Sequence, residues 1–90
     1  MIINNFKPLV IWLLNNTSID NNSKVTNREL REAFLSEYPE YKPFNSILAF
    51  HIGYLLKLMY GKDLIKTTGG GGKASYNILL PPDNQIRGGL

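Results

Sequence analysis

The first regular pattern of hydrophobic and polar positions predicts an amphipathic helix near the beginning of the chain. Apolar residues recur at the i, i+3, i+4, i+7 and i+8 spacing of one buried helix face, which holds Phe6, Leu9, Val10, Leu13 and Leu14. Trp12 and Ile11 widen the apolar arc, so we expect this helix to be covered on more than one side. Asn4 or Asn5 can cap it, and Pro8 fits its first turn, where no backbone N–H is needed.

A polar stretch at residues 15–24 predicts a loop, because Asn, Asp and Ser side chains bond to nearby backbone and compete with helix formation. Residues 24–26 could add a short strand. The second helix has a clear start, since Thr26 precedes Glu29 by the three residues of a capping box, with Asn27 as the competing cap. Its expected inner face is Leu30, Ala33, Phe34 and Tyr38, and its expected outer face is Arg28, Arg31, Glu32 and Glu37.

The third helix is the longest that the pattern predicts. Pro39 stops the second helix, residues 40–44 form a short connection, and the third helix runs over about residues 45–60. Gly61 is placed to end it as a left-handed cap. One predicted face holds Leu48, Ile52, Leu55, Leu56 and Met59, and the opposite face holds Ser46, Phe50, Gly53, Tyr54 and Lys57.

After Gly61 the hydrophobic period changes to that of strands. Residues 64–67 and 74–80 read as two strands, and the four glycines at 69–72 form the tip of a hairpin between them. A lone hairpin is marginally stable in water, so we expect it to dock on the helices through Leu64, Tyr76 and Ile78. Residues 81–90 are predicted to be a flexible tail or linker.

This order of elements predicts an α+β fold of the winged helix-turn-helix class. Three helices carry a C-terminal two-stranded β-hairpin as the wing, and the segment near residues 24–26 could supply a third short strand. We expect a single winged-helix domain at residues 1–80, because 90 residues are too few for two independent cores.

Three segments of this region resemble a particular group of winged helices: residues 52–62 (IGYLLKLMYGK), 65–66 (IK) and 72–78 (GKASYNI). The group comprises the DNA-binding domains of regulatory factor X proteins and the C-terminal winged helices of phage and large-virus primase-helicases. The resemblance covers residues 26–80 and implies a DNA-binding module in a replication or transcription-regulatory protein. The chain differs from this group in charge, since its third helix carries only Lys57.

Composition narrows the classes of function. The chain is 43% hydrophobic and 19% charged, which is typical of a globular domain. It has no Cys and one His, so a disulfide framework or a thiolate metal site is excluded and a cofactor or metal is not expected. The longest apolar run, residues 9–14, is too short to span a membrane, and residues 1–5 lack the basic n-region of a secretion signal. We expect a protein of the cytoplasm or nucleus, not a secreted one, and the abundance of Asn, Ile, Lys and Tyr favours a viral, mobile-element or low-GC bacterial source.

The net charge of +3 permits a polyanionic partner, and the fold directs attention to the third helix and the wing. In a winged helix the helix enters the major groove of duplex DNA, while the wing meets the neighbouring backbone. The glycines at 69–72 would let backbone N–H groups approach a phosphate. The residues predicted to contact DNA are Lys42, Asn45, Ser46, Tyr54, Lys57, Lys66, Thr68 and Lys73.

A second interpretation is a protein-interaction or dimerisation module without DNA binding. Phe50 and Tyr54, with Ile47 and Leu58 beside them, would then form the surface for a partner or a second copy. An enzyme is not predicted, because Ser46 and His51 do not face each other on a helix and no other nucleophile, acid–base pair or metal cluster is evident. His51 is instead expected to be a partly buried structural residue.

Overall fold

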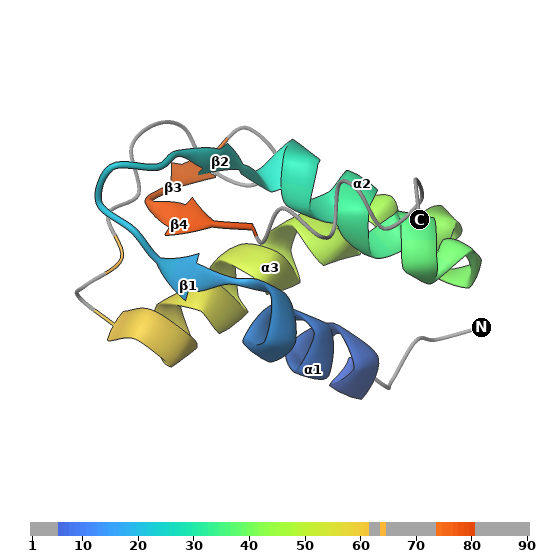
Figure 1. Cartoon of the computed structure of the whole chain (residues 1–90). Coiled ribbons are helices and arrows are strands. Elements are labelled where there is room, and N and C mark those ends of the chain that lie inside the picture. The colour runs from blue at the N-terminus through green and yellow to red at the C-terminus, as the bar shows by residue number, and fades with distance from the viewer. Residues whose placement is uncertain (1–5, 62–63, 65–73, 81–90) are drawn as a thin grey trace.

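The computed structural model describes residues 6–61, 64 and 74–80, and within them the protein is a small α+β domain (Figure 1). Its elements are α1 (Lys7–Asn16), β1 (Ser18–Ile19), β2 (Val25–Thr26), α2 (Asn27–Glu37), the 3-10 helix η1 (Pro39–Phe44), α3 (Asn45–Tyr60), β3 (Ser75–Tyr76) and β4 (Ile78–Leu79). The predicted α+β class and the predicted bounds of the third helix are confirmed. The predicted glycine tip at 69–72 and the tail at 81–90 lie outside the described residues.

The strands join the segment between α1 and α2 to the C-terminal part of the described chain. Antiparallel β1 and β4 place Ser18 opposite Leu79, and antiparallel β2 and β3 place Thr26 opposite Ser75. Between the two pairs, the backbone N–H of Asp20 donates to the carbonyl of Asn77 at 3.1 Å. The predicted strand at 24–26 is therefore confirmed as β2, whereas β1 interrupts the predicted loop because its pairing partner lies far along the chain.

The core lies where the three helices and the C-terminal strands meet. Its buried hydrophobic residues are Leu9, Trp12, Leu13, Val25, Leu30, Phe34, Tyr41, Leu48, Ile52, Leu56, Ala74, Tyr76 and Ile78. Leu64, the single described residue of the predicted first hairpin strand, is partly buried against this core and has no strand conformation. The expected docking of Tyr76 and Ile78 on the helices is confirmed.

The first helix differs from its predicted face at one end. Leu9, Trp12 and Leu13 are buried, but Leu14 is 59% exposed. Trp12 takes the inward position instead, because its ring meets Phe34 edge to face at a centroid distance of 5.8 Å. Phe6 occupies the N-cap position without a side-chain hydrogen bond, and the predicted caps Asn4 and Asn5 lie outside the described residues.

The capping box predicted at the start of α2 is confirmed. The backbone N–H of Glu29 donates to Oγ1 of Thr26 at 3.0 Å, and the backbone N–H of Thr26 donates to Oε1 of Glu29 at 2.8 Å. Two orphan donors of the helix terminus are thereby satisfied. Leu30 and Phe34 face the core as expected.

Two other residues of α2 were placed wrongly by the pattern. Asn27 is not a cap but is fully buried, and its side-chain nitrogen donates to the carbonyl of Ala49 at 2.9 Å and to the hydroxyl of Tyr76 at 3.0 Å. Arg31 does not simply face water, because its Nε donates to Oδ1 of Asn27 at 2.8 Å. Asn27 therefore ties α2 to both α3 and β3.

The link between α2 and α3 is more ordered than a short connection. It forms η1, whose Tyr41 is buried and meets the ring of Phe34 edge to face at 5.4 Å.

At the C-terminal end of α3, Gly61 has a positive φ of 59°, which glycine adopts without steric cost. Its ψ of −136° lies outside the left-handed helical region, so the predicted cap is present as a positive-φ glycine in another conformation.

Among the helices of the described residues, none combines the length and apolarity needed to cross a membrane.

Candidate functional site

α3 presents one face to the core and another to solvent. Leu48, Ile52 and Leu56 are fully buried. The residues on the opposite side are all exposed, and we call them the outer stripe of α3: Ser46, Ile47, Phe50, Tyr54, Lys57 and Leu58. This division follows the helical period, because residues three, four, seven and eight positions apart share a face.

The outer stripe exposes more hydrophobic surface than isolated apolar residues would. Phe50 is 72% exposed, Leu58 64%, Tyr54 63% and Ile47 43%. Phe50 and Tyr54 are four residues apart, so their side chains are neighbours on the helix surface. Large exposed apolar groups gathered on one element mark an interaction surface more often than chance.

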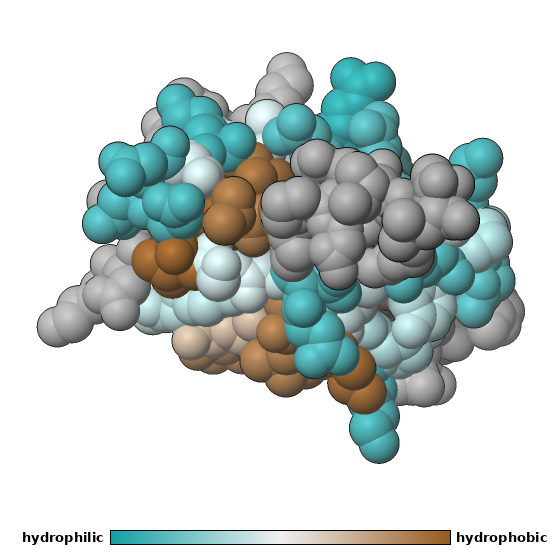
Figure 2. Space-filling model, viewed as in Figure 1, coloured by the Kyte–Doolittle hydropathy of each residue, from teal (hydrophilic) through white to brown (hydrophobic). Residues whose placement is uncertain are grey.

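Other apolar side chains reach the surface on neighbouring elements. Ile11 and Leu14 of α1 are 46% and 59% exposed, and Leu79 of β4 is 41% exposed. Figure 2 shows hydrophobic atoms over α1 at the lower edge of the view and over the strands at its left. Exposed apolar surface is therefore not confined to α3, but among the described elements only α3 carries two exposed aromatic rings within about one helical turn.

Charge on and beside the outer stripe is basic. α3 contains Lys57 and no Asp or Glu, and Lys42 is exposed on η1, immediately before α3. Glu40 is the acidic residue of η1. The outer stripe of α3 has exposed aromatic rings and Lys57, and Lys42 lies on the preceding η1. Such a surface suits a partner that is both negatively charged and partly apolar.

Several contacts fix the direction of α3. The ring of His51 stacks on Phe6 with centroids 3.9 Å apart and an interplanar angle of 13°. At the far end, the hydroxyls of Tyr60 and Thr17 are hydrogen-bonded at 2.7 Å. α3 is therefore contacted by the residues that flank α1 on both sides, Phe6 before it and Thr17 after it.

Gly53 lets β3 come close to the middle of α3. A Cβ at this position would lie 3.1 Å from the hydroxyl of Tyr76, closer than ordinary van der Waals contact. Gly53 is accordingly half-buried and does not share the solvent face with Phe50 and Tyr54, contrary to the helical-wheel prediction. The close approach leaves the Tyr76 hydroxyl within reach of Asn27.

Five of the eight residues predicted to contact DNA lie in the described part of the chain. Ser46, Tyr54 and Lys57 lie on the outer stripe, Asn45 is the first residue of α3, and Lys42 lies on η1. The other three, Lys66, Thr68 and Lys73, lie outside the described residues.

His51 has the structural role expected of it. It is half-buried, stacked on Phe6, and its Nδ1 lies 3.1 Å from the carbonyl oxygen of Ile47. Its nitrogen therefore points back along its own helix and not toward Ser46. Within residues 6–61, 64 and 74–80, no group of three or more His, Cys, Asp or Glu residues could hold a metal ion.

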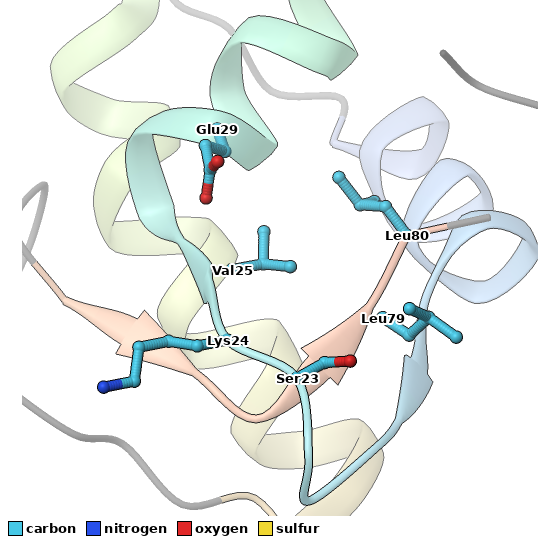
Figure 3. Close-up of a pocket in the computed structure, with 6 residues that line it drawn as sticks. All are labelled: Ser23, Lys24, Val25, Glu29, Leu79 and Leu80. Atoms are coloured by element: carbon cyan, nitrogen blue, oxygen red, sulfur yellow. The ribbon is translucent and has the colours of Figure 1, made fainter. Parts of the chain in front are cut away.

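A shallow pocket of about 260 Å³ lies elsewhere, between β2, the start of α2 and the C-terminal strand (Figure 3). Its lining residues are Ser23, Lys24, Val25, Glu29, Leu79 and Leu80. The Glu29 carboxylate is already used by the capping box, and the Lys24 side chain extends away from Leu79 and Leu80 (Figure 3). Ligand pockets usually exceed about 300 Å³ and contain several free polar groups that point toward the ligand. This pocket is smaller and its carboxylate is already bonded, so the outer stripe of α3 is the better candidate for the functional site.

Comparison with known proteins adds no relative. No protein-family model matches the chain, and neither a curated protein nor a solved structure matches it.

Proposed function

We propose that this chain is a winged-helix module that binds nucleic acid through α3. The order of α1, the β1–β2 segment, α2, α3 and the C-terminal strands supports the proposal, as does the antiparallel pairing of those strands with the β1–β2 segment. α2 and α3, joined by η1, are the proposed helix-turn-helix pair. The sequence resemblance to winged helices of replication and transcription-regulatory proteins points the same way.

The exposure of the outer stripe of α3 carries the proposal. A recognition helix needs a face that the core does not cover, and α3 has one that runs from Ser46 to Leu58. Lys57 on this face and Lys42 on η1 would neutralise phosphates, and Lys66 and Lys73, which lie outside the described residues, would add to this charge. Phosphate neutralisation supplies most of the affinity in such complexes, so binding is expected to weaken as salt rises.

The test compares two charge reversals of identical size. A fluorescein-labelled DNA with a duplex part and a single-stranded overhang is titrated with the wild-type protein, Lys57→Glu and Lys24→Glu, at about 50 and 200 mM salt. Lys24 is exposed beside the pocket and off α3, so it is the matched control. We expect Lys57→Glu to lower the affinity several-fold and to reduce the salt slope by about one, and Lys24→Glu to have a clearly smaller effect.

Equal effects of the two reversals would mean that binding reports net charge and not this face. An absence of binding at the lower salt would reject the proposed function itself.

A second candidate function is a winged helix that binds another protein. The exposure of Ile47 and Leu58 favours it, since aliphatic side chains contribute nothing to phosphate contacts. It predicts concentration-dependent self-association or a protein complex that Phe50→Asp disrupts, with no salt-dependent DNA binding. Sizing chromatography over a range of protein concentrations, run beside the DNA titration, separates the two functions.

A further inference from the structure

Phe50 and Tyr54 stand out among the aromatic residues of the protein. The ring contacts within the described residues involve Phe6, Trp12, Phe34, Tyr38, Tyr41 and His51. Phe50 and Tyr54 take part in none of these contacts, although each exposes more than half of its surface. The two rings are therefore available to a ligand.

An intact DNA duplex offers few favourable contacts to the rings of Phe50 and Tyr54. Bases in the major groove are read mostly through hydrogen bonds to their edges, and a phenyl ring has neither donor nor acceptor. Apart from thymine methyl groups, Phe50 in the middle of the outer stripe would meet polar base edges with which it forms no hydrogen bond. The face of an unpaired base, in contrast, is flat and apolar and stacks on aromatic side chains whatever its sequence.

We propose that the outer stripe of α3 binds nucleic acid with unpaired bases, which stack on Phe50 and Tyr54. The inference rests on the proposed nucleic-acid function and names the class of nucleic acid that this face takes: a single strand, or the unpaired end of a duplex. It differs from the double-stranded partner expected from the sequence.

The charge of the helix fits such a strand. Lys57 lies three residues after Tyr54, about one turn further along the same face, where its ammonium group can reach the phosphate that follows a stacked base. Ser46, one turn before Phe50, supplies a hydroxyl at the other end. α3 has no carboxylate that would repel the strand. Rings that stack on bases, followed by a cation for the backbone, are the combination found in proteins that bind single strands.

A protein partner would use the same rings differently, and the variants can tell the two apart. An apolar protein surface tolerates leucine in place of phenylalanine, because leucine keeps most of the apolar area. Base stacking needs the flat ring. Phe50→Leu and Tyr54→Leu therefore remove stacking while leaving an apolar stripe, and Phe50→Tyr and Tyr54→Phe are the matched controls that keep the ring.

The experiment measures fluorescence anisotropy of a labelled mixed-sequence single strand and of the same strand annealed to its complement, at one low salt concentration. The wild-type protein is expected to bind the single strand at least fivefold more tightly than the blunt duplex. Phe50→Leu and Tyr54→Leu should each weaken single-strand binding by about fivefold to 100-fold, whereas the ring-conserving variants should stay within about twofold of wild type. Both positions are exposed, and the emission of buried Trp12 verifies folding.

Two results would overturn the inference while leaving the proposed function intact. One is duplex binding as tight as single-strand binding. The other is single-strand binding that the leucine variants do not change. If neither DNA binds, the proposed function fails together with the inference. A dimer in sizing chromatography that Phe50→Leu preserves would also overturn the inference, because a second copy would then cover the stripe.

Discussion

The side chain of Asn27 donates a hydrogen bond of 3.0 Å to the hydroxyl of Tyr76, across 49 residues of sequence. Both residues are buried, and Asn27 also donates to Ala49 and accepts from Arg31. One amide thus connects the first turn of α2 with the middle of α3 and with β3. This buried network is therefore one of the contacts that hold α3 against the rest of the domain.

Replacement of Asn27 by Ala is predicted to be strongly destabilising. It leaves the Ala49 carbonyl, the Tyr76 hydroxyl and Arg31 without the partner they share, and an unsatisfied buried polar group costs about 1–3 kcal/mol. We expect a loss of about 2–3 kcal/mol in the free energy of unfolding, measured by urea denaturation with Trp12 emission as the probe. Asn22→Ala, at an exposed loop position, is the control and should change stability by less than about 0.5 kcal/mol. A similarly small loss for Asn27→Ala would show that the network does not hold the fold.

Gly53 and Tyr76 are predicted to be energetically coupled. In a helix interior, alanine is more favourable than glycine by about 1 kcal/mol. A Cβ at residue 53, however, would lie only 3.1 Å from the Tyr76 hydroxyl. Gly53→Ala should therefore stabilise the protein more in a Tyr76→Phe background than in the wild type. A double-mutant cycle of unfolding free energies gives this coupling, for which we expect at least about 0.5 kcal/mol. Strict additivity would mean that α3 and β3 are further apart than described.

The capping box of α2 provides a third prediction. Thr26→Ala removes the oxygen that accepts from the Glu29 backbone N–H, and loss of an N-cap side chain costs about 0.5–2 kcal/mol. Thr26→Ser keeps that oxygen and should retain most of the stability. Thermal unfolding followed by circular dichroism tests the pair, and equal midpoints for the Ala and Ser variants would contradict the role of the cap.

Local signals in the sequence were sufficient to predict the three α-helices and both ends of α2. The Thr26–Glu29 spacing predicts the start of α2, and Pro39 predicts its end, because capping and the loss of a backbone donor act within a few residues. The exposed positions of Ser46, Tyr54 and Lys57 followed from the period of α3 in the same way.

Features that depend on distant contacts were not predictable. Asn27 looks like a cap because Asn is a common capping residue, and its burial becomes evident only once Ala49 and Tyr76 are placed beside it. Leu14 fits the periodic face of α1 but is exposed, since the contact of Trp12 with Phe34 rotates that face. β1 was missed because a two-residue strand within a polar segment has no pattern of its own, and its pairing with β4 spans most of the chain.

The central claim, that the outer stripe of α3 binds nucleic acid, is tested most directly by mapping where the ligand lies. Titration of the ¹⁵N-labelled protein with the overhang DNA should shift the amide resonances of Ser46, Phe50, Tyr54 and Lys57, and leave those of Ser23 and Lys24 beside the pocket nearly unchanged. Shifts centred on the pocket, or no shifts at saturating DNA, would contradict the account.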